Sequence, residues 1–238
     1  MAALSTTEFN GNLATVRNIR HCAYRSTTDF DVRYFDQQVD LNQIQTVDLI
    51  VVPFGDFPNL AHVMTSFGMT DGSYICVSIE IRRETHESFD PLKGFFNQYE
   101  IMYVVGDERD LIHLRANYRR DEVYIYRVKA NPEQAQRMFV SMMNRANKIA
   151  REPEFYNTIT NNCTTNVVWH VNELAPSLIR YGSEVLLPGH SPKLAYSLGL
   201  IENPENKSFE QIHAEARVTE QAYRHREDPN FSQAIRRR

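Results

Sequence analysis

The stretch that decides the fold is "HVMTSFGMTDGSYICVSIEI", residues 62–81, because its pattern predicts a β-hairpin and also its register. Apolar residues alternate along both halves of the stretch: Val63, Phe67, Met69, Ile75, Val77, Ile79 and Ile81. A shift of one residue would turn one apolar set to the other face of the sheet, so burial selects the register. The register that unites both sets has a three-residue loop, 70–72, and pairs Met69 with Ser73.

Counting back along this register places His62 opposite Glu80, and it pairs two further positions, Met64 with Ser78 and Ser66 with Cys76. A histidine with a carboxylate across from it is the base and orienter that a cysteine–histidine enzyme requires. The same pair is equally consistent with an ordinary cross-strand contact worth about 0.5 kcal/mol. Taken alone, the residues leave both interpretations open.

The rest of the chain predicts an α+β fold, with a mostly antiparallel sheet packed against helices. Residues rich in β-branched and aromatic side chains, bounded by turn residues, predict strands at 47–54, 62–69, 73–83, 99–106, 110–117 and 122–130. Residues 131–152 predict a helix that starts with the Asn131 cap and Pro132. Its expected buried stripe comprises Ala135, Met138, Phe139, Met142, Ala146 and Ile149. The charged segment after Gly199 is expected to be partly helical and to lie on the surface.

A second stretch, "NTITNNCTTNVVWHVN" at residues 157–172, carries the candidate nucleophile. Asn161 and Asn162 are both N-cap candidates for a helix over 164–173, which puts Cys163 in its first turn. There the free amides and the helix dipole are expected to lower the thiol pKa and later to bind an oxyanion, with Asn162 and Thr164 in support. The alternative is a small, buried, apolar cysteine.

Other residues are weaker candidates. Cys76 lies in the middle of a predicted strand and is expected to be structural. His170 lies on the same helical face as Cys163 but two turns away, about 10 Å, which is too far for direct proton exchange. Side chains near Glu80 are candidates for substrate contacts, since a guanidinium suits phosphate, although a solvated strand end is the simpler interpretation: Ser78, Arg82, Arg83 and Tyr99.

Composition excludes several function classes. The formal net charge of −4 argues against bulk binding of nucleic acid. Three cysteines without CxxC spacing, and histidines without an HExxH motif, predict no metal site, and the absence of a glycine-rich phosphate loop predicts no nucleotide cofactor. Residues 1–12 lack a secretory signal, and no stretch is apolar enough to span a membrane. We therefore expect either a cytoplasmic protein or one from which a membrane anchor has been removed.

Several sequence blocks in order carry a family resemblance: "RNIRHCAY", "AHVMTSFGM", "VSIEIRRE", "GFFNQYEIMYVVGDERDLIHLR", "VYIYRV" and "YNTITNNCTTNVV". From about Thr15 to Leu200 the chain resembles the Lnb-type N-terminal periplasmic domain family, one branch of which is a bacterial lipoprotein N-acyltransferase. The resemblance implies a circularly permuted papain-like thiol fold without cofactors. Cys163 matches the family's "NC" cysteine, His62 the histidine of its "H…SF" block, and Glu80 the glutamate of "SxExR". The "NC" is also similar to that of lecithin:retinol acyltransferase-type enzymes.

The resemblance implies a thiol-dependent acyltransferase at the periplasmic face of the membrane. An acyl-thioester on Cys163 would pass a fatty acyl group from a phospholipid to a lipoprotein amino terminus. The alternatives are a cysteine peptidase or amidase and a catalytically idle binding domain of the same fold. The expected organisation is an extension at 1–14 that follows a removed anchor, a catalytic domain at 15–202 and a charged, partly helical extension at 203–238 packed on the domain. We expect the anchor, rather than this chain, to bind the membrane surface.

Overall fold

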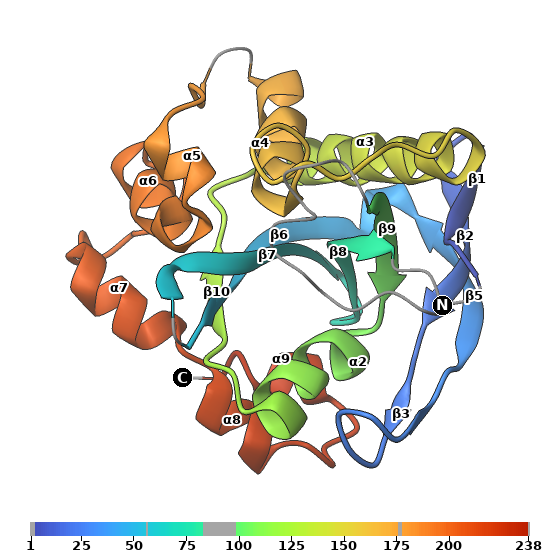
Figure 1. Cartoon of the computed structure of the whole chain (residues 1–238), viewed down its shortest axis with the longest axis horizontal. Coiled ribbons are helices and arrows are strands. Elements are labelled where there is room, and N and C mark those ends of the chain that lie inside the picture. The colour runs from blue at the N-terminus through green and yellow to red at the C-terminus, as the bar shows by residue number, and fades with distance from the viewer. Residues whose placement is uncertain (1–2, 56, 83–98, 176–177, 238) are drawn as a thin grey trace.

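The computed structural model describes residues 3–55, 57–82, 99–175 and 178–237. Eight of its strands form one sheet in the order β1-β2-β9-β8-β7-β6-β10, with β5 paired to β2, and β3 pairs with β4 apart from it (Figure 1). The sheet pairs are antiparallel except for β2 with β9. The strands are β1 Thr6–Asn10, β2 Leu13–Arg20, β3 Ala23–Tyr24, β4 Phe30–Asp31, β5 Tyr34–Asp40, β6 Ile44–Phe54, β7 Phe57–Met69, β8 Tyr74–Arg82, β9 Glu100–Gly106 and β10 Tyr124–Arg127.

Helices cover both faces of this sheet, which confirms the α+β class. The long helices α3 and α4 lie on one face, and α2, α8 and α9 lie on the other (Figure 1). The helices are η1 Leu41–Gln43, α2 Glu108–His113, the π-helical η2 Leu114–Arg119, α3 Pro132–Arg151, α4 Cys163–Leu174, α5 Ser183–Leu186, η3 Pro188–His190, α6 Ser191–Ser197, α7 Phe209–Ala216, α8 Thr219–Arg224 and α9 Phe231–Ala234.

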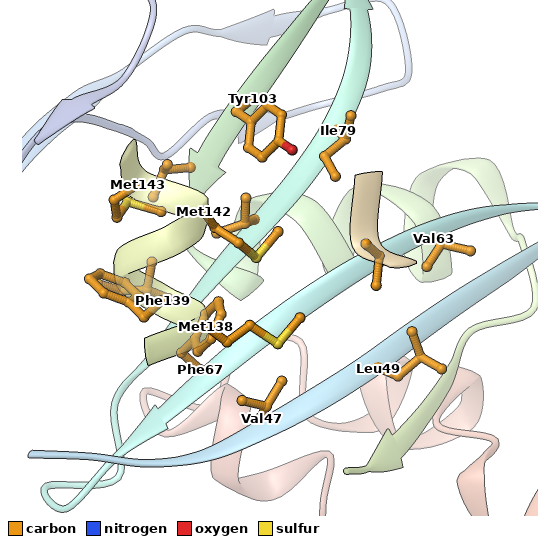
Figure 2. Packing of buried hydrophobic residues seen from close by; sticks show 14 of the residues in the cluster. Val47, Leu49, Val63, Phe67, Ile79, Tyr103, Met138, Phe139, Met142 and Met143 are labelled. Carbon is orange, nitrogen blue, oxygen red and sulfur yellow. The ribbon is translucent and has the colours of Figure 1, made fainter. Parts of the chain in front are cut away.

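The larger core lies between the sheet and α3. Figure 2 shows Met138 and Met142 of α3 pointing at the sheet, where Val47 and Phe67 lie beside Met138. The predicted helix is confirmed: Asn131 caps it with a capping box, Pro132 begins it, and its predicted apolar stripe is buried. Burial of this stripe, more than helix propensity, stabilises such a helix.

The predicted hairpin register is also confirmed. Met64 pairs with Ser78 and Ser66 with Cys76, and the amide of Met69 donates to the carbonyl of Ser73 at 2.9 Å. Gly72 closes the three-residue loop with φ +81°, a left-handed conformation that favours glycine. The odd-numbered residues of β7 face α3 and α4. On the other face of the sheet a second core lies against α2, α8 and α9, and His62, Met64 and Ser66 point to that side.

One element prediction was wrong. Residues 110–117 are not a strand but lie in α2 and η2. Asp107 caps α2 by accepting from the amide of Arg109 at 2.8 Å. Leu111, Ile112 and Ala116 then reach the core on a single helical face. Four apolar residues within seven fit either a short strand or a short helix, and only the neighbouring sheet face decides between them.

The two chain ends contribute more structure than the sequence indicated. No strand was predicted before residue 47, yet β1, β2 and β5 complete one side of the sheet. The C-terminal segment is helical as expected, and it buries apolar side chains in the second core: Val218, Ala222, Phe231 and Ile235. The domain boundaries at 14 and 202 stay predictions. Within the described residues, no helix has the length and apolarity needed to span a membrane.

Candidate functional site

Cys163 is the first residue of α4, as expected, and of the two candidate asparagines Asn162 is its cap. The side chain of Asn162 accepts from the amide of Thr165, whose hydroxyl accepts in turn from the amide of Asn162, each at 2.8 Å. The side-chain nitrogen Nδ2 of Asn162 also donates to the carbonyl of Thr158 at 2.6 Å. Because both ends of this side chain hold the helix start, Asn162 acts as the cap of α4, and the oxyanion role expected for it stays a prediction.

The sulfur of Cys163 lies where two strands of the sheet separate. The ladder between β7 and β8 runs from Gly68 to Met64 and stops there. Odd-numbered amides of β7 point toward β8, as the amide of Met69 does, so the next amide in the series belongs to Val63. That amide faces the Cys163 sulfur, where it favours the thiolate.

Burial decides the acidity of this thiol, and it overturns the sequence expectation of a lowered pKa. Cys163 is only 7% exposed, and loss of solvation raises its pKa above the ordinary value. The Val63 amide, the Thr164 hydroxyl 3.9 Å from the sulfur and the first amides of α4 act in the opposite direction. Desolvation outweighs these donors, so the resting group is a thiol.

His62 is connected to Glu80 through a buried serine. The Nε2 atom of His62 lies 2.7 Å from the Ser78 hydroxyl, and that hydroxyl donates to Oε1 of Glu80 at 2.8 Å. The direct distance from His62 Nε2 to Glu80 Oε1 is 3.9 Å. The predicted facing of His62 and Glu80 is thus present, with Ser78 as the link. Ser78 is fully buried, so we assign it to holding His62 rather than to substrate.

Arg115 completes this row of side chains. Its guanidinium donates to Oε1 of Glu80 at 2.9 Å and to the carbonyl of Leu111 at 2.8 Å. Although burial opposes ionisation of Glu80, the Arg115 charge holds the pKa of that carboxyl well below its usual range. Arg115 was not among the predicted site residues, because residues 110–117 were predicted as a strand. A signal was present: an arginine at the same helical face as two buried apolar residues has to find an anion.

Burial and the neighbouring Arg115 charge together lower the pKa of His62 to about 3, against the opposing effect of Glu80. The imidazole is therefore neutral at physiological pH and able to accept a proton. Cys163 and His62 flank the same peptide group, the one between His62 and Val63, from opposite faces of the sheet. Within the described part of the chain, no hydrogen bond joins the sulfur to the imidazole.

Among the remaining predicted residues, Thr164 lies beside the thiol, with its hydroxyl 3.9 Å from the sulfur. Thr164 and Tyr99 are buried, and the Tyr99 carbonyl accepts from the amide of Tyr156, which holds the loop leading to α4. Arg82 is 41% exposed and pairs with Glu100 at 3.1 Å. Arg83 lies outside the described residues. Cys76 is fully buried in the second core.

His170, the rival base, is fully buried, and both of its ring nitrogens contact hydroxyl groups of other residues. Its Nδ1 lies 2.6 Å from the Ser141 hydroxyl and its Nε2 lies 2.9 Å from the Tyr103 hydroxyl. These contacts join α4 to α3 and β9, so His170 acts in packing the helix rather than on the thiol.

Two hollows of the surface lie away from Cys163. One, of about 710 Å³, runs between α3 and α4 beside Trp169, and the other, of about 460 Å³, lies along β10 and the C-terminal helices. Neither is lined by Cys163 or His62.

A family model described as the Lnb N-terminal periplasmic domain matches residues 30–188, more than half of the 238 residues of the chain. The match spans both His62 and Cys163. No curated protein and no solved structure matches significantly.

Proposed function

Because the chain belongs to the Lnb N-terminal periplasmic domain family, we propose that it is a thiol-dependent acyltransferase acting outside the cytoplasm through Cys163 and His62. The observation that carries the proposal is the meeting of the two residues at one peptide of β7. A thiol at a helix start faces the Val63 amide, and the next residue back along β7 is a neutral, oriented histidine.

In the proposed reaction the Cys163 thiol passes its proton to Nδ1 of His62 as the sulfur attacks an ester carbonyl. The amides of Val63 and of the first turn of α4 stabilise the developing negative charge. The carbon–oxygen bond to the leaving group then breaks, and the imidazolium returns its proton to that oxygen. An amine attacks the thioester, the carbon–sulfur bond breaks and the thiol is restored.

We assign the acyl donor to phospholipid and the acceptor to a lipoprotein amino terminus, on the family resemblance alone. The order of β7, β8 and α4 along the chain, with histidine before cysteine, agrees with a permuted papain-like arrangement. Proton transfer requires the sulfur and the ring to approach each other, as in other enzymes whose catalytic hydrogen bonds tighten only with substrate.

A catalytically idle domain is the second candidate, and the burial of Cys163 with its raised pKa favours it. The test is incubation with phosphatidylethanolamine vesicles followed by intact-mass measurement. We expect an acyl adduct that hydroxylamine removes and that a lipopeptide with a free amino terminus accepts. Cys163→Ser should abolish the adduct, whereas Cys22→Ser should retain it, since both cysteines are 7% exposed.

Other outcomes of this experiment would indicate a different function. An adduct released only to water indicates a hydrolase. Acylation by a peptide thioester or ester but not by phospholipid indicates a peptidase or amidase. If no acyl donor marks Cys163, the enzymatic proposal is wrong and the idle domain stands.

A further inference from the structure

We propose that Arg115 is a positioning residue that sets which ring nitrogen of His62 carries the proton, acting through Glu80 and Ser78. Its importance for catalysis rests on the proposed function, because only a base with a free lone pair toward Cys163 can take the thiol proton. Its effect on the His62 ring, however, can be measured without any reaction.

The geometry brings two hydrogen-bond donors to one oxygen of Glu80. Ser78 and Arg115 both contact Oε1 of Glu80, at 2.8 and 2.9 Å. The Arg115 side chain is 5% exposed and its second contact, to the Leu111 carbonyl, fixes it on the π-turn. Such single π-turns are frequent at functional sites. Arg115 therefore holds the Glu80 charge at the far end of a row that begins at His62.

Proton counting along this row gives the tautomer. An ionised carboxylate can only accept hydrogen bonds. The single hydroxyl proton of Ser78 must therefore go to Glu80, and it is not free for His62. The 2.7 Å contact between Ser78 and His62 then requires that Nε2 carries a proton and donates it. Nδ1 is left with a lone pair, which is the state that a general base needs.

Removing the Arg115 charge reverses the direction in which these hydrogen bonds are donated. Glu80, partly buried and without its cation, has a raised pKa and takes up a proton from solvent. The protonated carboxyl donates to Ser78, the Ser78 hydroxyl turns to donate to Nε2 of His62, and the ring proton moves to Nδ1. The number of protons on the ring stays the same, but Nδ1 no longer has a lone pair for the thiol.

Other charges around the pair are less direct. Arg119 lies on the same turn and is exposed, and it acts on His62 only through space. Arg20 of β2 also favours the Glu80 anion, but it donates to Asp110 at 2.8 Å. Among the described residues, Arg115 is the cation that is hydrogen-bonded to Glu80.

The experiment reads the His62 tautomer by NMR of protein labelled with ¹⁵N-histidine, in a Cys163→Ala background that removes the reaction. Loss of signals in His62→Gln identifies the residue. We expect the Nε2–H tautomer in the parent protein from about pH 5 to about pH 9, above the ordinary pKa of glutamate. Arg115→Met should show Nδ1–H at the acid end and return to Nε2–H as Glu80 ionises. Arg119→Met, the matched control, should resemble the parent.

The inference is overturned if the parent carries Nδ1–H, or if Arg115→Met keeps Nε2–H throughout. Should Arg115→Met fail to fold, Arg115→Gln removes the charge but keeps an N–H donor and is expected to switch in the same way, whereas Arg115→Lys is expected to restore the parent tautomer. A second readout, iodoacetamide labelling of Cys163 in protein that retains the thiol, should slow about tenfold or more in Arg115→Met at the acid end. If the tautomer switches and labelling does not change, the positioning role stands and the thiol–imidazole function fails.

Discussion

At Cys163 the start of α4 and the burial of the sulfur shift the thiol pKa in opposite directions. Helix-start amides favour a thiolate. The pKa of Cys163 is nevertheless raised, because the sulfur is buried away from solvent. His62 is likewise uncharged for the same reason. In the proposed reaction, a neutral thiol and a neutral imidazole require that proton transfer accompany attack, in contrast to enzymes that rest as a thiolate and imidazolium pair.

This state predicts how Cys163 reacts without His62. Replacing His62 by Gln removes the acceptor of the thiol proton, so labelling of Cys163 by iodoacetamide near pH 7 should slow by about 100-fold, the usual effect of a general base. Mass spectrometry of the Cys163 peptide follows the rate. His225→Gln serves as the control, because His225 is half-buried and its ring pairs with Asp228 at 3.6 Å. Equal rates in the parent and His62→Gln would contradict a base role for His62.

The elements that local patterns predicted best are those whose burial follows a single periodicity. The hairpin of β7 and β8 alternates strictly, and α3 repeats its apolar residues at helical spacing. The segment 110–117 has a short apolar pattern that fits two structures, and its prediction as a strand was wrong. Length therefore separates the two cases: α3 has 20 residues and α2 has 6.

The cap of α4 gives a prediction at the scale of this element. Asn162→Ala removes the acceptor for the Thr165 amide and the donor to Thr158, so unfolding free energy should fall by about 1–2 kcal/mol. Amide hydrogen exchange over residues 163–166 should accelerate. Asn131→Ala, which removes the same kind of capping box from α3, should cost about 1 kcal/mol and leave exchange at 163–166 unchanged. Unaltered exchange in Asn162→Ala would show that the cap does not order the thiol.

In the whole molecule, the C-terminal residues close the core that holds His62. Arg236 bonds to Asp48 of β6 at 2.9 Å and to Glu108 of α2 at 2.5 Å. Its guanidinium lies 3.7 Å from the centre of the Tyr74 ring of β8. The basic end of the chain thus joins three elements that are distant in sequence.

We predict that Arg236→Ala destabilises the protein strongly. The change leaves two buried carboxylates short of a partner, which costs about 3–5 kcal/mol when one member of a buried pair is lost. The neighbouring Arg237 is exposed, and Arg237→Ala should change stability by less than about 0.5 kcal/mol. Urea unfolding of both variants makes the comparison. Similar midpoints for the two would mean that Arg236 is not a structural anchor.

Acid should unfold the protein through its buried histidines. The pKa values of His62 and His170 are both lowered to about 3 by burial, below the ordinary value of 6.5 that applies in the unfolded chain. Unfolding therefore takes up protons below about pH 6.5, and stability falls toward pH 3 by up to about 1.4 kcal/mol per pH unit for each histidine.

Urea unfolding between about pH 7 and about pH 5, above most carboxylate titrations, isolates this effect. His170→Gln should show a shallower fall than the parent, and His225→Gln the same fall as the parent. A parent whose stability does not change across this interval would mean that the buried histidines carry a charge in the folded state.

By itself the sequence determined the α+β class, the hairpin register that puts His62 and Glu80 together, helix α3 and the capped start of α4 at Cys163. Each depends on neighbours a few residues apart, where periodicity and caps act. Only the tertiary structure decided that Arg115 and Ser78 join His62, that Arg236 closes the second core, and that Cys163 is held as a thiol. These outcomes depend on which distant segments exclude water from a group, because the free energy of a buried charge follows its surroundings and not its place in the chain.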